Sequence, residues 1–342
     1  MPQVTLEPGG ATFECAAEES ILSAALRAGY LIPYGCKNGA CGSCKGTLKS
    51  GELRYGAYQT STLPEAERVQ GKALFCVAHP VGDVVIEARD VRKTGDIVVK
   101  TMPCRIEHLD RVTDDVMIVR FKLPSSERLL YRAGQYMEFI LKDGARRSFS
   151  MANAPHDDAL IELHIRHMSG GLFTDRLFGV RDPAVKVREI FRFEGPHGSF
   201  FLREESEKPI IFLASGTGFA PIKAIVEHMI YTGNRRKAVI YWGGRRPSDL
   251  YLDHLVRSWV AKYPDQFSYV PVVSNALAED DWQGRTGFVH RAVMEDLPDL
   301  SAHQVYACGA PVVIDSARRD FVAERRLPES DFFADSFTSP GR

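Results

Sequence analysis

The sequence lacks the features that would place the chain in several specialised classes of protein. Its 342 residues carry 43 Lys and Arg against 44 Asp and Glu, a formal net charge of -1. This balance offers no basic excess for binding nucleic acid or an anionic membrane surface. The N-terminus has no basic segment followed by an apolar core, so no secretory signal is expected.

Long hydrophobic runs are also missing. The longest apolar stretch, Ile210 to Val226, is interrupted by Gly216, Gly218 and Lys223, whereas a membrane span needs about 20 predominantly apolar residues. We expect a strand, a loop and a helix there, no membrane association, and a cytoplasmic protein. The seven cysteines are an odd number and nothing marks secretion, which disfavours a disulfide framework.

Three of those cysteines lie in one glycine-rich loop. Cys36, Cys41 and Cys44 follow the spacing CxxxxCxxC, and Cys76 comes later from a separate segment. This is the plant-type ligand pattern of a [2Fe-2S] cluster. A structural zinc site is the alternative, but zinc usually takes two CxxC-type pairs instead of three ligands from one loop. We therefore predict an iron-sulfur cluster.

The N-terminal region reads as a small mixed sheet packed on one helix. Residues 4–6 and 11–14 predict a hairpin, Ser20 is a helix N-cap, and residues 47–49 and 84–87 alternate like strands. Hairpin, helix, metal loop and closing strand resemble the plant-type ferredoxin (β-grasp) fold over residues 1–92. The charged residues 90–102 show no clear period and predict a linker.

Residues 102–204 predict an antiparallel β-barrel. Alternating segments at 116–123, 135–141 and 161–167 are separated by turns. Arg147-Ser148-Phe149-Ser150 resembles the RxYS flavin motif of the ferredoxin-NADP reductase superfamily, with Phe149 where tyrosine is commoner. The resemblance implies that Arg147 binds the FAD pyrophosphate, Phe149 faces the isoalloxazine and Ser150 lies near its N5 edge. An ordinary strand in a sheet is the alternative.

A second segment of the barrel is a candidate for the same cofactor. His164 and Arg166 precede a glycine-flanked helix start that holds Gly171, Leu172 and Thr174. Free amides at a helix N-terminus suit a pyrophosphate, although a helix start with incidental glycines would look alike. Taken in this order within one barrel, the two segments favour FAD.

Residues 207–342 predict a parallel-sheet, nucleotide-binding α/β domain. The apolar strand at 209–214 leads into a loop and a helix at 222–231, and the strands at 237–242 and 304–307 also end in small residues. Three such ends imply one crevice for an extended nucleotide. The first loop resembles GGTGxAP of the same superfamily, which gives as candidates Gly216, Thr217, Gly218, Ala220 and Pro221.

The last of these strands ends in Cys308-Gly309-Ala310-Pro311. It resembles the CGxP motif of the superfamily, which implies that Cys308 lies near the nicotinamide, with Gly309 and Pro311 beside it. A lone buried cysteine that only packs is the alternative.

The resemblance spans the whole chain. The modular order is similar to reductase components of aromatic-ring dioxygenases and multicomponent monooxygenases, and most similar to CDP-6-deoxy-delta-3,4-glucoseen reductases. It implies an NAD(P)H-dependent iron-sulfur flavoprotein oxidoreductase that passes electrons through FAD and the cluster to a partner protein, a dehydrase or oxygenase component. Two alternatives stay open: a stand-alone flavin or ferric reductase, and an iron-sulfur redox sensor without turnover.

Two finer expectations concern the nicotinamide. Related reductases place a terminal aromatic against the flavin, which makes Phe337 a candidate gate, unless it only plugs a hydrophobic interface. Gly243 and Arg245 follow the second strand of the nucleotide domain, where a ribose is expected. Arg245 and Arg246 make NADPH conceivable, but residues 243–251 resemble the GxRxxxDLY segment of NADH-using bacterial reductases. Since Asp249 would further repel a 2′-phosphate, we expect NADH to be preferred over NADPH.

Overall fold

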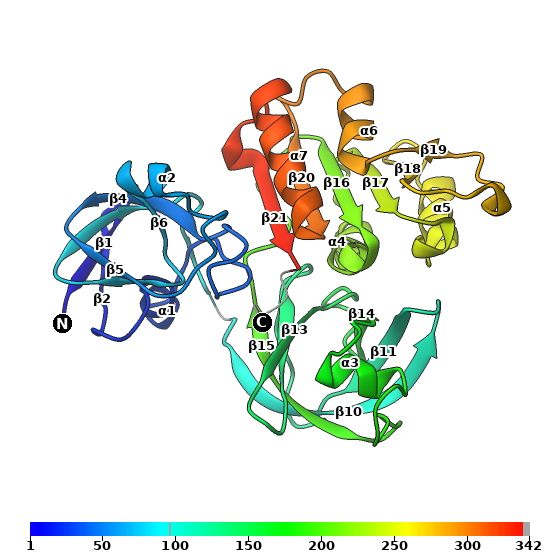
Figure 1. Cartoon of the computed structure of the whole chain (residues 1–342), viewed down its shortest axis with the longest axis horizontal. Helices are drawn as coiled ribbons and strands as arrows, with labels where there is room; N and C mark the ends of the chain where they lie inside the picture. Colours follow the sequence, from blue (N-terminus) through cyan, green and yellow to red (C-terminus); the bar gives the residue numbers. More distant parts are fainter. Residues whose placement is uncertain (96, 338–342) are drawn as a thin grey trace. The chain divides into compact units, whose positions relative to one another are not determined.

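The computed structural model describes residues 1–95 and 97–337, which form two compact units (Figure 1). The N-terminal unit comprises Met1–Val98 with Gly198–Phe200 and the segment that starts at Ala334. The C-terminal unit comprises Val99–His197 and Phe201–Phe333. Across the described residues, no helix combines the length and the apolar character needed to cross a membrane. The three domain boundaries expected from the sequence stay predictions.

The N-terminal unit is built on a five-stranded mixed sheet in the order β2-β1-β8-β4-β6. Strand β1 pairs antiparallel with β2 and parallel with β8, while β4 pairs antiparallel with both β8 and β6. Helix α1 contributes buried Ile21, Leu22 and Ala25, and its N-cap Ser20 accepts a bond of 3.2 Å from the Ser23 amide, as predicted. The bounds are β1 (Gln3–Glu7), β2 (Ala11–Glu14), α1 (Ile21–Arg27), β4 (Lys45–Ser50), β6 (Lys72–Leu74) and β8 (Val84–Glu87).

Short elements complete this unit. They are β3 (Tyr30–Leu31), β5 (Leu53–Tyr55), α2 (Glu65–Val69), β7 (Ala78–Pro80) and β9 (Arg92–Lys93). Strand β9 pairs with β3, and the next strand already starts at Lys100. The segment 90–102, predicted as a linker, thus contains a short strand and the start of β10, and its role as a linker stays a prediction. Strand pairing uses backbone groups, so the charged side chains of this segment did not reveal the strand.

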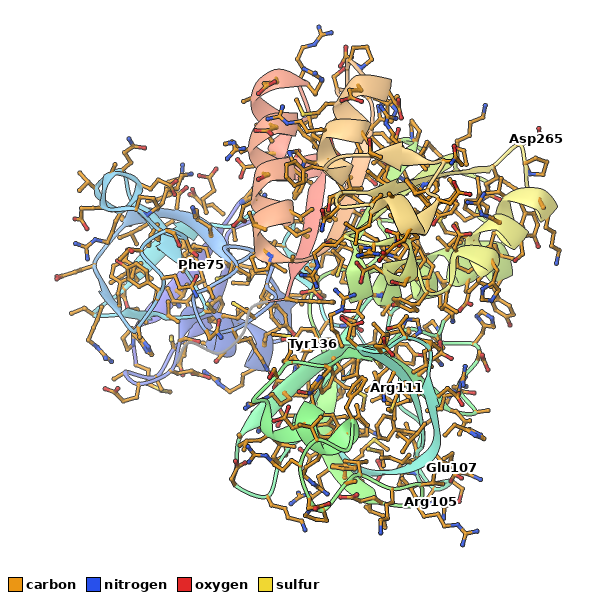
Figure 2. All side chains as sticks on the ribbon, turned by 45° about the vertical axis from the view of Figure 1, so that its right-hand side comes forward. Phe75, Arg105, Glu107, Arg111, Tyr136 and Asp265 are labelled. Atoms are coloured by element: carbon orange, nitrogen blue, oxygen red, sulfur yellow. The ribbon has the colours of Figure 1, made fainter. Side chains whose placement is uncertain are left out.

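The C-terminal unit begins with a six-stranded antiparallel sheet in the order β13-β12-β15-β10-β11-β14. A bridge between Met151 and Leu163 joins its two edges, which gives the predicted barrel. Buried Cys104 and Ile106 alternate along β10 with Arg105 and Glu107, which point outward (Figure 2). The bounds are β10 (Lys100–Arg111), β11 (Val116–Lys122), β12 (Tyr136–Ile140), β13 (Arg146–Ser150), β14 (Ile161–Arg166), α3 (Leu172–Leu177) and β15 (Ile190–His197).

The same unit ends in a six-stranded sheet in the order β19-β18-β17-β16-β20-β21, with parallel pairing from β19 through β20. Because parallel strands feed their carboxyl ends to one edge, the loops after β16, β17 and β20 meet there. The bounds are β16 (Ile210–Ser215), α4 (Phe219–Thr232), β17 (Ala238–Gly244), α5 (Asp253–Lys262), β18 (Phe267–Val273), β19 (Arg285–Thr286), α6 (Val289–Asp296), β20 (Gln304–Gly309), α7 (Pro311–Glu324) and β21 (Phe332–Ser336).

Candidate functional site

The fold of the N-terminal unit brings the four predicted ligand cysteines together. The Sγ atoms of Cys44 and Cys76 are 3.1 Å apart. Cys36 and Cys41 each accept the other's amide at sulfur, at 3.4 and 3.3 Å. All four thiols are free. Four converging sulfurs on a loop and a separate turn are the donor set of a [2Fe-2S] cluster, so the site fits that group.

Phe75 explains how the fourth cysteine reaches the loop. Pairing of β4 with β6 sets Lys45 opposite Leu74, so the chain turns at Cys76 directly beside Cys44. Phe75, 1% exposed and labelled in Figure 2, packs over Gly46 and donates its amide to the Cys44 carbonyl at 3.2 Å. A side chain at Gly46 would collide with the Phe75 ring, so this glycine is required for the close approach.

Negative charge is stabilised on two of the four sulfurs, those of Cys36 and Cys76, whereas hydrogen bonds to these two sulfurs and burial raise the pKa of Cys41 and Cys44. The Cys41 thiol and the amides of Asn38 and Ala40 together lower the pKa of Cys36 to about 6, against the opposing effect of burial. The Cys44 thiol and the Gly39 amide likewise lower the pKa of Cys76. Thiolate is the form that binds iron. Gly39 has a φ of 74°, and a Cβ there would lie 2.6 Å from the Cβ of Tyr58, so the loop can turn inward only at a glycine.

The predicted flavin motif lies on β13 with alternating side chains. Phe149 packs between Phe139 and Phe173, with centroid distances of 5.6 Å to each, and Ser148 donates to Glu138 at 3.3 Å. Arg147 is half-buried and donates to the Arg146 carbonyl at 2.8 Å. Among the described side chains Arg147 has no carboxylate partner, so its guanidinium is available for an anion such as a pyrophosphate. The strand therefore fits the FAD predicted for it.

The second predicted flavin segment is held by its own hydrogen bonds. The Thr174 hydroxyl donates to the Met168 carbonyl at 2.9 Å and accepts from the Met168 amide at 3.2 Å. A Cβ at Gly171 would lie 2.8 Å from that same carbonyl, so only glycine fits this turn. Leu172 follows as the first residue of α3. The structure thus explains why these residues form a tight turn, and their contact with FAD stays a prediction.

The nucleotide loops interlock at the carboxyl edge of the parallel sheet. A Cβ at Gly218 would overlap the Cys308 carbonyl and lie 2.7 Å from the Cα of Gly309. In the other direction, a Cβ at Gly309 would lie 2.5 Å from the Ser215 carbonyl. Thr217, Ala220 and Pro221 complete the first loop and the start of α4. Two predicted segments far apart in sequence thus meet backbone to backbone at the sheet edge where open α/β sheets bind nucleotides.

The stacked rings of Trp242 and Phe219 hold the loop after β16 in place. Trp242, fully buried on β17, donates its indole N–H to the Gly216 carbonyl at 3.0 Å and stacks on Phe219 at 3.9 Å. Tyr251 packs edge-on against the same indole at 5.2 Å. This pinning of Gly216 was not predicted from the sequence.

The loop after β17 carries the charges that bear on the choice of nucleotide. Asp249 accepts the amides of Arg245 and Arg246 at 2.7 and 3.0 Å and the Arg166 guanidinium at 2.6 Å. Burial opposes ionisation of Asp249, but these amides and the Arg166 charge hold its pKa below the usual value. Arg246 is paired with both oxygens of Asp280, at 2.8 and 2.7 Å. Arg245 is exposed and unpaired within the described part of the chain.

The sequence did not indicate how exposed the side chains of His164 and Phe337 are. The His164 side chain is fully buried, and both ring nitrogens bond protein side chains, Tyr251 at 2.9 Å and Glu162 at 3.0 Å. Phe337 is 37% exposed at the end of the described chain. Direct roles of these two side chains at the cofactors stay predictions.

Comparison with known proteins supports these assignments across the chain. Residues 4–81 match the 2Fe-2S iron-sulfur cluster binding domain, residues 103–202 the oxidoreductase FAD-binding domain, and residues 212–319 the oxidoreductase NAD-binding domain. The CDP-6-deoxy-L-threo-D-glycero-4-hexulose-3-dehydrase reductase of Yersinia pseudotuberculosis is 40% identical over 334 residues, 98% of both chains. The chain belongs to the iron-sulfur flavoprotein reductases.

Other members of this reductase family align equally completely. Reductase component 1 of terephthalate 1,2-dioxygenase from a Comamonas species is 33% identical over 99% of this chain and 98% of its own. The crystal structure of an Amycolatopsis cytochrome P450 reductase superposes with a TM-score of 0.79 at 30% identity, covering 99% of both chains. These comparisons confirm the predicted fold class and the prediction of an NAD(P)H-dependent iron-sulfur flavoprotein oxidoreductase.

Sequence reasoning missed residues that contact the predicted sites but were not themselves predicted to bind a cofactor. Trp242 and Tyr251 contact the predicted site residues Gly216 and His164, and Lys223 donates to the carbonyl of Ala152, two residues beyond Ser150. One signal was available: Lys223 and Glu227 are charged residues four apart on a helix otherwise apolar enough to be buried, and buried charges require partners.

Proposed function

We propose that this reductase takes electrons from NADH and delivers them, through FAD and the [2Fe-2S] cluster, to a deoxysugar dehydrase. The observation that carries the proposal is the convergence of four free thiols in a chain that also holds the flavin strand and the interlocked nucleotide loops. The end-to-end identity of 40% with a reductase named for a hexulose dehydrase supports the choice of partner.

Particular residues would hold each cofactor. Cys36, Cys41, Cys44 and Cys76 would ligate the cluster, Arg147 would bind the FAD pyrophosphate, and the loops at Gly218 and Gly309 would admit the nicotinamide nucleotide. FAD supplies two-electron chemistry toward a hydride donor and one-electron chemistry toward an iron-sulfur centre. The protein's own contribution is to bind, orient and shield these groups. Ser150, Cys308 and Phe337 are the side chains we assign to the flavin-nicotinamide contact.

The preference for NADH rests on how the loop after β17 is built. A 2′-phosphate is recognised by cations with free donors, and Arg246 already uses its guanidinium on Asp280. That leaves Arg245 as the one unpaired cation of this loop within the described residues. The repulsion expected from Asp249 is weaker than the sequence suggested, because Arg166 pairs with its carboxylate. The proposed preference for NADH therefore rests on the ion pair between Arg246 and Asp280, which occupies the Arg246 guanidinium.

An oxygenase component is the alternative electron acceptor. Reductase components of terephthalate 1,2-dioxygenase from a Comamonas species and of phenol 2-monooxygenase from a Pseudomonas species are each 33% identical over nearly the whole chain. Since loops around the cofactors can stay unchanged while the partner differs, the acceptor is tested separately from the cofactors.

The proposal is tested in two stages. Iron, sulfide and flavin analysis with a visible spectrum, followed by kcat/KM with NADH and NADPH, tests the cofactors; absence of flavin or sulfide, or a clear NADPH advantage, would contradict them. Purified reductase is then mixed anaerobically with a hexulose dehydrase and, in parallel, with a Rieske-type oxygenase component. Faster single-turnover reduction of the oxygenase would overturn the choice of dehydrase.

A further inference from the structure

Strand β14 carries three polar side chains on one face, and each reaches a different part of the nucleotide-binding sheet. Glu162, His164 and Arg166 alternate with buried Ile161, Leu163 and Ile165, as the two-residue period of a strand requires. Their partners are Lys223 on α4, and Tyr251 and Asp249 on the loop that follows β17. Barrel and parallel sheet are therefore joined by one row of polar contacts.

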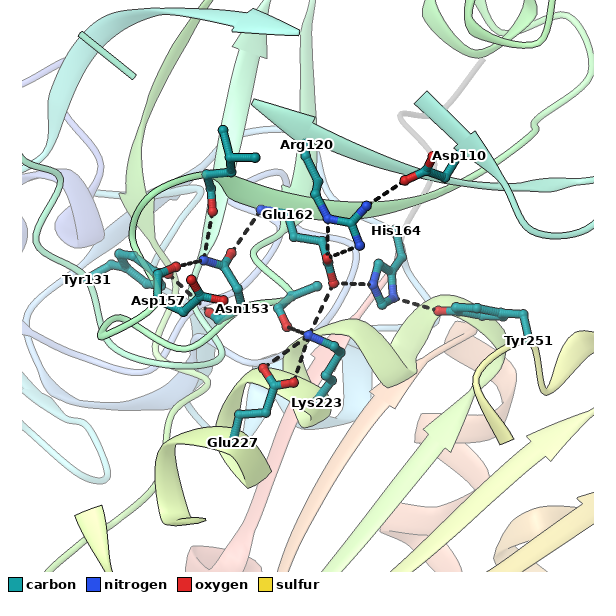
Figure 3. Close-up of polar contacts among 12 residues, drawn as sticks. Asp110, Arg120, Tyr131, Asn153, Asp157, Glu162, His164, Lys223, Glu227 and Tyr251 are labelled. Atoms are coloured by element: carbon teal, nitrogen blue, oxygen red, sulfur yellow. Dashed lines mark hydrogen bonds and ion pairs between the residues drawn. The ribbon is translucent and has the colours of Figure 1, made fainter. Parts of the chain in front are cut away.

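Lys223 is a buried charge of this row, as is its partner Glu162. It is 8% exposed, and its ammonium contacts the Glu162 carboxylate at 3.1 Å, the Glu227 carboxylate at 2.9 Å and the Ala152 carbonyl at 3.1 Å (Figure 3). Ala152 lies two residues beyond Ser150 of the flavin motif, and Lys223 is the fifth residue of α4, the helix that starts at the nucleotide loop. One ammonium thus ties the two cofactor segments together.

Glu162 stays ionised beside this ammonium. It also accepts from Arg120 at 2.8 Å and from His164 at 3.0 Å (Figure 3). Burial alone would raise the pKa of Glu162, but the His164 bond and the charges of Lys223 and Arg120 hold it well below the usual range. Loss of Lys223 would therefore leave Glu162 with two remaining partners, and the barrel can keep its fold.

His164 extends the row as a neutral ring. Burial lowers the pKa of His164, and the Glu162 bond opposes this only in part. A neutral imidazole that donates from Nε2 to the Glu162 carboxylate accepts at Nδ1 from the Tyr251 hydroxyl. Tyr251 in turn packs on Trp242, which holds the Gly216 carbonyl. A second line of contacts thus runs from β14 to the nucleotide loop.

We propose that Lys223 is a positioning residue for hydride transfer, which holds the nucleotide loop in register with the flavin strand through Glu162 and the Ala152 carbonyl. The inference rests on the proposed binding of FAD to the barrel and of the nicotinamide nucleotide to the parallel sheet. Lys223 touches neither cofactor under this assignment. Its removal should leave nucleotide affinity nearly intact and disturb the alignment of donor and acceptor.

Lys223→Met tests the inference, with Lys208→Met as the matched control. Lys208 also forms an ammonium-carboxylate pair, with Asp331 at 2.8 Å, but this pair does not involve the barrel. Misplacement of reacting groups by about 1 Å can cost about a hundredfold in rate. We expect Lys223→Met to lower the limiting rate of flavin reduction by NADH at least about tenfold, while the dissociation constant for NAD⁺, measured by calorimetry, changes less than about threefold.

A spectroscopic readout separates positioning from simple stability. The charge-transfer absorbance of the reduced protein with NAD⁺ should weaken in Lys223→Met and be unchanged in Lys208→Met. Tyr251→Phe, which removes only the hydroxyl at His164, should show a smaller loss of the same kind and keeps the assay available if Lys223→Met does not fold. Limiting rates and absorbance equal to Lys208→Met in both variants would overturn the inference. A wild-type protein that neither nucleotide reduces would instead overturn the proposed function, and the inference with it.

Discussion

Gly218 offers a test of the crevice that can be worked out from the backbone alone. A Cβ at this position would overlap the Cys308 carbonyl and lie 2.7 Å from the Gly309 Cα, where carbon atoms prefer about 3.5–4.0 Å. The two loops must then separate by roughly 1 Å. Overpacking of this kind costs about 1–3 kcal/mol. If the whole cost is taken from the free energy of nucleotide binding, Gly218→Ala weakens NAD⁺ binding about 5- to 150-fold.

Gly233→Ala, at the other end of the same helix, is the matched control. Gly233 has a φ of 72° and nothing within 4 Å of a built Cβ, so alanine there brings backbone strain of about 1–2 kcal/mol without a collision. Calorimetric NAD⁺ binding and flavin and iron content are measured for both variants. We expect weaker NAD⁺ binding only in Gly218→Ala, with both cofactors retained. Wild-type affinity in Gly218→Ala would show that the interlocked loops do not form the nucleotide crevice.

Three further outcomes follow from the other sites. Cys41→Ser should abolish the iron-sulfur centre and cytochrome c reduction while ferricyanide reduction by NADH survives, since the flavin and nucleotide parts belong to a different compact unit; unchanged iron content would refute the ligand assignment. Arg245→Ala should weaken NADH and NADPH similarly, and Arg246→Ala should lower the melting temperature through the lost Asp280 pair; selective loss of NADPH in either variant would reverse our nucleotide preference. Phe337→Ala should change the charge-transfer absorbance and hydride-transfer rate, whereas a shift in melting temperature alone would favour a packing role.

The sequence was most informative where chemistry restricts residue type and spacing together. Few structures need four cysteines in the pattern of Cys36, Cys41, Cys44 and Cys76, so the cluster site could be predicted without knowledge of the fold. That Gly218 and Gly309 lie at one edge was expected, because strand ends of a parallel sheet meet there whatever the strand order; their role in binding a nucleotide comes from the family resemblance and stays a prediction.

Contacts between segments distant in sequence could not be read in the same way. The period of β14 predicts that Glu162, His164 and Arg166 share a face, but nothing in the sequence says which helix or turn that face meets. The same limit explains why the strand within residues 90–102 was not foreseen. Strand β9 is held by backbone bonds to Tyr30 and Leu31, which no side-chain pattern encodes.

The row of contacts along β14 has a consequence for the exchange of modules between reductases. A chimera joined between the barrel and the parallel sheet, near residue 205, would separate Glu162, His164 and Arg166 from their partners Lys223, Tyr251 and Asp249. A donor sheet that lacks these partners would leave buried carboxylate and imidazole groups unsatisfied. A chimera should therefore take all three pairs from the same parent, so that the β14 face of the barrel keeps its partners on the parallel-sheet side.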